Sequence, residues 1–147
     1  MIISRLLSNQ IVNNWELIKF AVLAVNNISS NYAQEYCNGL LINLLAEKYQ
    51  CWFGVTDNRL DVKGVAITKI YKDVGNISHL MIDSLYVYST TIVEERTLFI
   101  ENIKKFGNTI NCKDILFHTS NSKLVEVANL LGFEETSKIF KINIGGV

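Results

Sequence analysis

The sequence predicts an α/β domain built on a mixed sheet, with its elements in the order α-α-β-β-β-α-β-α-β. Apolar residues recur at intervals of three and four through the first third of the chain, as on one face of a helix. They alternate with polar residues through the middle third, as in strands, and both patterns return in the last third. The length of 147 residues suits one domain, so we expect residues 1–147 to form a single unit.

Two helices are predicted in the first third of the chain. The first begins at a cap provided by Ser8 or Asn9, and its apolar stripe consists of Ile11, Trp15, Ile18, Val22 and Val25. The second runs from Tyr32 to about Lys48. Gly39 lies inside it and weakens the helix by up to ~1 kcal/mol relative to alanine. We expect this glycine to mark close packing against another element.

Three strands are predicted in the middle third, at residues 51–55, 64–71 and 77–87. The segments between them are rich in Asp, Asn and Gly, which favour turns. The third strand is apolar on both faces around its end, as expected at the centre of a sheet. Short turns between consecutive strands predict an antiparallel meander.

The last third predicts a helix, a strand, a second helix and a terminal strand. The first helix carries Ile92, Phe99, Ile103 and Phe106 on one face and ends at Gly107 or Asn108. A short strand follows at residues 114–119. The second helix ends at Gly132, in the position that a left-handed cap requires. Residues 137–144 alternate between apolar and polar and predict the terminal strand.

Composition excludes several classes of protein. The 14 basic and 14 acidic side chains balance, which argues against nucleic-acid binding by phosphate neutralisation. The longest apolar run, residues 20–25, is far shorter than the about 20 residues of a membrane span, and the first residues carry no signal-peptide pattern. Three cysteines cannot pair evenly, which favours a reducing compartment and a cytoplasmic location.

The histidines and cysteines show no spacing typical of a metal site. His79 and His118 fall on predicted strands, where hydrogen-bonded sheet histidines are the simplest interpretation. Cys37, Cys51 and Cys112 form no C-x-x-C pair, so we expect core thiols and no bound metal. A Cys–His nucleophile pair stays open, because such partners meet only in space.

Two stretches resemble the GCN5-related N-acetyltransferase (GNAT) superfamily. One is Leu85-Tyr86-Val87, which is similar to the end of the family's central strand. The other is Asn121 followed eleven residues later by Gly132-Phe133-Glu134. The resemblance spans residues 9–144. It implies a central strand that splays from its neighbour, with a cofactor groove along Leu85, Tyr86 and Val87. Asn121 would touch the arm of acetyl-CoA there, or would simply cap the last helix.

The family's phosphate-binding loop is not matched. The loop aligns with residues 88–97, and the family's glycines fall on Val93, Glu95 and Thr97. Glycines in such a loop let successive backbone N–H groups approach the phosphate oxygens. Glu94 and Glu95 instead place two negative charges at the start of the predicted helix, where they favour the helix dipole and repel a diphosphate.

The family's catalytic residues are also incompletely matched. The tyrosine that acts as general acid in the family aligns with Ala128, which has no proton to donate. A general base could be Asp83, expected on the same strand face as Leu85; pairing with a neighbouring lysine or hydroxyl is the simpler interpretation. The rings of Tyr86 and Tyr88 are expected where the cofactor would enter and would close the cleft.

These observations predict a GNAT-fold protein that has lost acetyl-CoA binding and needs no cofactor. Its apolar share of 49% and mean hydropathy of +0.20 suit a binding or structural subunit, with a protein partner in a homo-oligomer or a viral particle. The alternative is a divergent acyl-CoA-dependent N-acyltransferase that uses Asp83 as its base.

Overall fold

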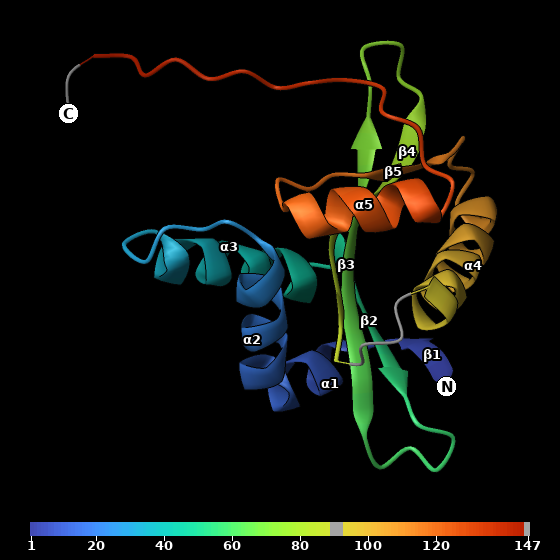
Figure 1. The fold of residues 1–147 in the computed structure, drawn as a ribbon. Helices are drawn as coiled ribbons and strands as arrows, with labels where there is room; N and C mark the ends of the chain where they lie inside the picture. The colour runs from blue at the N-terminus through green and yellow to red at the C-terminus, as the bar shows by residue number, and fades with distance from the viewer. Residues whose placement is uncertain (89–92, 146–147) are drawn as a thin grey trace.

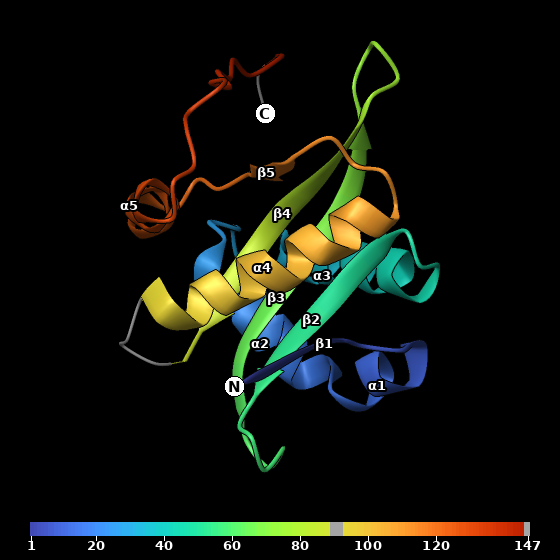
Figure 2. The ribbon, with the colours of Figure 1, turned by 90° about the vertical axis from the view of Figure 1, so that its right-hand side faces the viewer.

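The computed structural model describes residues 1–88 and 93–145. Its centre is a five-stranded sheet in the order β1-β2-β3-β4-β5, seen face-on in Figure 2. The strands are β1 (Ile2–Arg5), β2 (Tyr49–Val55), β3 (Val62–Lys72), β4 (Ser78–Val87) and β5 (Ile115–Phe117). The first four strands pair antiparallel, and β5 pairs parallel with β4. The predicted meander and the mixed α/β class are both confirmed.

Helices cover both faces of the sheet. α1 (Ser8–Asn13), α2 (Trp15–Val25) and α3 (Ala33–Leu45) lie on one face, and α4 (Val93–Thr109) crosses the other (Figures 1 and 2). α5 (Ser122–Leu130) lies beside the β5 side of the sheet. None of the helices in residues 1–88 and 93–145 is both long enough and apolar enough to cross a membrane.

The alternation of the strands divides the apolar residues between two cores. On the face of α1 to α3, helix residues pack on Cys51, Phe53, Val65 and Ile67. On the face of α4, Phe99 and Ile103 pack on Leu80, Ile82, Leu85 and Val87. The Phe99 ring lies so close to Gly54 and Gly64 that a Cβ atom at either glycine would come within 2.9 Å of it. These two glycines let α4 approach the sheet.

The N-terminal third differs from the prediction in three ways. Residues Ile2–Arg5 form β1, which pairs with β2 and is too short for its four residues to show a clear period. The first predicted helix is two helices, separated at Asn14, and it is preceded by Leu7 as the cap, not by Ser8 or Asn9. Gly39 has no atom within 4 Å of where its Cβ would lie, so it does not mark close packing.

The predicted terminal strand is wrong. Residues 134–145 contain no regular secondary structure and leave the body as an extended arm (Figure 1). The four large apolar side chains of the arm are 82–98% exposed: Ile139, Phe140, Ile142 and Ile144. Alternation gives a segment the pattern of a strand, but a strand forms only when its backbone finds a partner. No strand in the described part of the chain pairs with these residues.

Candidate functional site

The two parallel strands, β4 and β5, separate after three paired residues. β4 pairs with β5 only through Leu80, Met81 and Ile82. β4 then continues to Val87, while β5 ends at Phe117. Along residues 83–87, the side of β4 that faced β5 therefore has no strand partner among the described residues. This agrees with the splayed central strand that the resemblance implies.

A β-bulge lies where the strands separate. Ile67 of β3 pairs with Ser84, and the next residue, Thr68, pairs with Ile82, so Asp83 is the extra residue. Leu80 and Ile82 before the bulge and Leu85 after it all pack in the core under α4. The bulge thus reverses the alternation, and Asp83 does not share a face with Leu85 as the sequence predicted. Its carboxylate lies on the side of α3.

Asp83 is the centre of a polar group that we call the Asp83 cluster: Asp83, Lys69, His118, Tyr36 and Tyr49. Its Oδ2 atom lies 3.2 Å from Lys69 Nζ, and its Oδ1 atom lies 3.8 Å from His118 Nδ1. The Lys69 ammonium also lies 5.5 Å from the centre of the Tyr49 ring. The sequence placed Asp83 beside a lysine or hydroxyl, and the lysine is confirmed.

The Asp83 cluster is partly open to solvent. The Asp83 side chain is 16% exposed and that of His118 is 57% exposed. Burial, followed by the negative charge of Asp83, raises the pKa of the Tyr36 phenol to about 12, so this group stays protonated at neutral pH. Lys69 pairs with one carboxylate oxygen of Asp83, and the other oxygen lies 3.8 Å from Nδ1 of the exposed His118 ring.

The groove residues named by the resemblance divide between core and surface. Leu85 and Val87 are buried under α4. Tyr86 instead contacts Phe20 of α2, with ring centres 6.0 Å apart, and Tyr88, with ring centres 4.7 Å apart. Phe20 and Tyr88 stack at 6.4 Å. These three rings, which we call the aromatic trio, lie together between α2 and the end of β4; the sequence identified the two tyrosines but not Phe20.

Asn121 caps α5. Its Oδ1 atom accepts hydrogen bonds from the backbone N–H groups of Lys123 (3.0 Å) and Leu124 (3.4 Å). Its Nδ2 atom donates to the carbonyl oxygen of Val25 at the end of α2 (3.2 Å). Both polar atoms of the side chain are therefore engaged within the protein, which fits the capping role given as an alternative above.

The start of α4 is acidic. The helix begins at Val93 and carries Glu94 and Glu95 in its first turn. One carboxylate oxygen of Glu95 is buried and has no hydrogen-bond partner among the described residues. Of the segment that aligns with the family's phosphate-binding loop, residues 88–97, residues 89–92 lie outside the described residues. Two carboxylates in the first turn are suited to the helix dipole and unsuited to a diphosphate.

The remaining candidate residues lie elsewhere. His79 lies at the opposite end of β4, where its ring nitrogens lie 2.8 Å from Asp73 Oδ2 and 2.5 Å from Asp114 Oδ1. Hydrogen bonding to Asp73, and next to Asp114, raises the pKa of His79. Burial raises the pKa of the Cys51 thiol to about 12, which makes it an inert core residue.

Cys37 is likewise buried, and Cys112 is half-buried. In the described ranges, no three His, Cys, Asp or Glu side chains are grouped closely enough to hold a metal ion.

No protein-family model and no curated protein matches the sequence. Solved structures do match the fold over nearly the whole chain. A ribosomal-protein-alanine N-acetyltransferase from Brucella melitensis superposes with a TM-score of 0.71 at 11% identity, covering 98% of this chain and 100% of the other.

A predicted acetyltransferase from Clostridium acetobutylicum, solved with acetyl-CoA, superposes with a TM-score of 0.70 at 14% identity, covering 97% and 95%. An aminoglycoside N-acetyltransferase in complex with CoA superposes with a TM-score of 0.65 at 16% identity, covering 98% and 99%. The splayed parallel strands and the order of elements agree with these similarities, and this chain has the fold of the GNAT acetyltransferases.

Proposed function

We propose that this chain is a GNAT-fold protein that has lost acetyl-CoA binding and acts as a binding or structural subunit of a larger assembly, in the cytoplasm or in a viral particle. The observation that carries the proposal is the pair Glu94 and Glu95 in the first turn of α4. In the family that the fold resembles, this helix start receives the cofactor's diphosphate. In a subunit that no longer binds the cofactor, the fold serves to present surfaces that bind a partner.

The sizes of two electrostatic effects decide whether the start of α4 attracts or repels a diphosphate. The helix dipole favours an anion by about 0.3–1 kcal/mol. A like-charged pair at about 4 Å repels by about 1 kcal/mol in water and about 4 kcal/mol at the effective dielectric constant of a protein surface. Repulsion by two carboxylates at that distance would exceed the attraction that the backbone offers, and Arg96 in the same turn offsets part of the charge of Glu95. This charge arrangement supports the proposal that the chain does not bind acetyl-CoA.

Two further residues support the proposal. Ala128 on α5 has no group that could protonate a departing thiolate. Asn121 uses both of its polar atoms to cap α5 and to hold α2. Of these two positions, Ala128 lacks the chemistry that the family uses, and Asn121 is occupied by contacts within this chain.

Calorimetric titration of the full chain with acetyl-CoA tests the proposal. We expect no binding heat up to millimolar donor. The variant Glu94→Gln/Glu95→Gln, which removes both charges and keeps the side-chain size, is expected to bind more tightly than wild type. Glu101→Gln/Glu126→Gln removes two charges elsewhere and is the matched control. Micromolar binding by wild type would contradict the proposal.

A second candidate is a divergent acyl-CoA-dependent N-acyltransferase. The Asp83 cluster favours it, because a partly exposed carboxylate lies at a bulge where the two central strands separate. Asp83 would then accept a proton from the acceptor amine through the oxygen that Lys69 does not occupy. This candidate predicts donor-dependent acylation of an amine that is lost in Asp83→Asn and kept in Asp57→Asn, an exposed carboxylate elsewhere. An inactive wild type on a broad amine panel would rule it out.

A nucleic-acid partner is not part of either proposal. The chain has no net formal charge, so counterion release would provide little binding free energy. A filter-binding measurement at low salt checks this expectation directly, and retention of DNA or RNA would contradict it.

A further inference from the structure

The outer edge of β5 pairs with no other strand in residues 1–88 and 93–145. Leu80 N–H donates to the Asp114 carbonyl oxygen (3.1 Å), and His118 N–H donates to the Ile82 carbonyl oxygen (3.0 Å). Backbone groups of successive strand residues point to alternate sides, so those of Ile115 and Phe117 point away from β4. β5 is the last strand of the sheet among the described residues. Such an edge is a template for one more strand.

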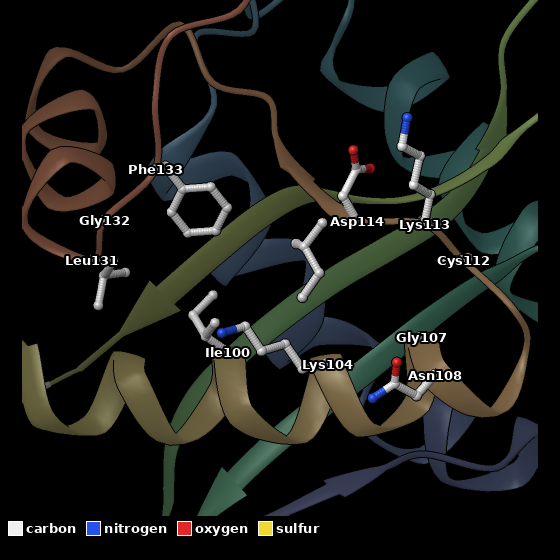
Figure 3. A pocket seen from close by; sticks show the side chains of 11 residues that line it. Ile100, Lys104, Gly107, Asn108, Cys112, Lys113, Asp114, Leu131, Gly132 and Phe133 are labelled. Atoms are coloured by element: carbon white, nitrogen blue, oxygen red, sulfur yellow. The ribbon is translucent and has the colours of Figure 1, made fainter.

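A hollow lies beside this edge, on the side of α4 (Figure 3). Its volume is about 350 Å³. α4 contributes Ile100 and Lys104, and the turn after α5 contributes Leu131 and Phe133. Ile115 of β5 lines the hollow between them. The hollow therefore combines apolar side chains with the polar side chains of Lys104, Asn108, Lys113 and Asp114, and it borders the backbone of β5.

The arm has the pattern that such an edge would accept. Phe140, Ile142 and Ile144 lie at alternate positions, with Lys141 and Asn143 between them. In an extended strand, the side chains of Phe140, Ile142 and Ile144 share one face, and those of Ile139, Lys141 and Asn143 share the other, which we call the polar face. The apolar face is almost fully exposed in the isolated chain. Eight residues from 137 to 144 would span about 27 Å as a strand.

The start of the arm directs it away from its own β5. Gly132 has a positive φ of 87°, and the Phe133 N–H donates to the Ala128 carbonyl oxygen (3.0 Å), as in a left-handed helix cap. The Phe133 ring then packs edge-on against Phe117, with centres 5.6 Å apart. From this anchored point the arm runs outward, and Figure 2 shows it to one side of the strands of its own sheet.

We propose that residues 137–144 of one copy of this chain add as a strand to the β5 edge of a second copy, and reciprocally. Phe140, Ile142 and Ile144 would lie against the hollow of the second copy. Each copy offers both the arm and the edge, so two exchanges close a symmetric dimer without leaving either element exposed. The proposal deepens the proposed function, because it names the partner as a second copy.

Mass measurement by light scattering on the full chain is the first test. We expect wild type to be a dimer at micromolar concentration. Ile142→Asp places a charge on the apolar face of the arm and is expected to raise the dimer dissociation constant at least 100-fold. Asn143→Asp introduces the same charge at the adjacent position on the polar face and is expected to change it less than fivefold. Since residue 142 is 90% exposed in the isolated chain, the first variant should fold normally.

Amide hydrogen exchange identifies the docking edge. The N–H groups of Ile115 and Phe117 are expected to be protected in wild type and in Asn143→Asp, and to exchange at least tenfold faster in Ile142→Asp. A monomeric wild type, a dimer unaffected by Ile142→Asp, or unprotected Ile115 and Phe117 amides in the dimer would each overturn the proposal. None of these outcomes depends on acetyl-CoA. The dimer proposal can therefore be refuted while the proposed loss of cofactor binding stands, and the reverse is also true.

Discussion

Three buried polar groups in neighbouring strands form a hydrogen-bonded chain whose disruption has a calculable effect. Trp52 Nε1 donates to Thr68 Oγ1 (2.9 Å), and Thr68 Oγ1 donates to Gln50 Oε1 (2.8 Å). All three residues are at most 7% exposed. Thr68→Val keeps the shape of the side chain but removes the hydroxyl, which leaves the indole N–H and the amide oxygen without a partner.

Each buried group left without a partner costs about 1–3 kcal/mol, and the added methyl group returns about 0.8 kcal/mol. We therefore expect Thr68→Val to lower the free energy of unfolding by about 3 kcal/mol. Thr68→Ser keeps the hydroxyl and loses only a buried methyl group, so it should lower it by about 1 kcal/mol. Urea unfolding with an unchanged m-value measures both. If the valine variant lost no more stability than the serine variant, the hydrogen-bonded chain would not contribute as described.

Three further predictions concern a close packing contact, a helix cap and an ionised side chain. Gly64→Ala should destabilise the protein by about 1–3 kcal/mol, because the new Cβ would lie 2.9 Å from the backbone oxygen of Tyr86. Gly39→Ala places its Cβ in open space and should stabilise the protein by about 0.5–1 kcal/mol. Urea unfolding measures both changes in the free energy of unfolding, and changes of the same sign would contradict the packing described for Gly64. Asn121→Ala should lower the free energy of unfolding by about 1 kcal/mol through loss of the α5 cap, and an unchanged urea midpoint would contradict this. The pKa of His79 is raised above its ordinary value of 6.5, so its stabilising contribution is full below that pH and is lost as the pH rises through the raised value. The urea midpoint should therefore fall above about pH 6.5, and the fall should be smaller in His79→Gln; an equal fall in the variant would contradict this contribution.

Local patterns were sufficient for most of the architecture. The helical stripe of α2 and the alternation of β2, β3 and β4 predict those elements because each period is set by backbone geometry within the segment. The same holds for Gly132, whose positive φ follows from its place after the last helix. The missing glycines and the two carboxylates at the start of α4 are likewise properties of the sequence.

The candidate site could be predicted only in part. Asp83 was identified, and its partner class was foreseen, but the bulge that moves it to the opposite face from Leu85 depends on the register between β3 and β4. Register is decided by how two distant segments pair, so a period of two within one strand cannot reveal it. Phe20 was missed because it joins Tyr86 and Tyr88 only after α2 packs on the sheet.

The sequence by itself determined the fold class, most of the helices, the central strands, the acidic start of α4 and the absence of a proton donor at Ala128. The tertiary structure alone decided the pairing of β1, the reversal at Asp83 and the fate of residues 134–145. The physical reason is the range of the interactions. Side-chain periodicity and charge are local, whereas a strand exists only when another backbone satisfies its hydrogen bonds. The arm carries the alternation of a strand and lies unpaired, because after Phe133 it runs away from the β5 edge of its own sheet (Figure 2) and its backbone meets no other strand among the described residues.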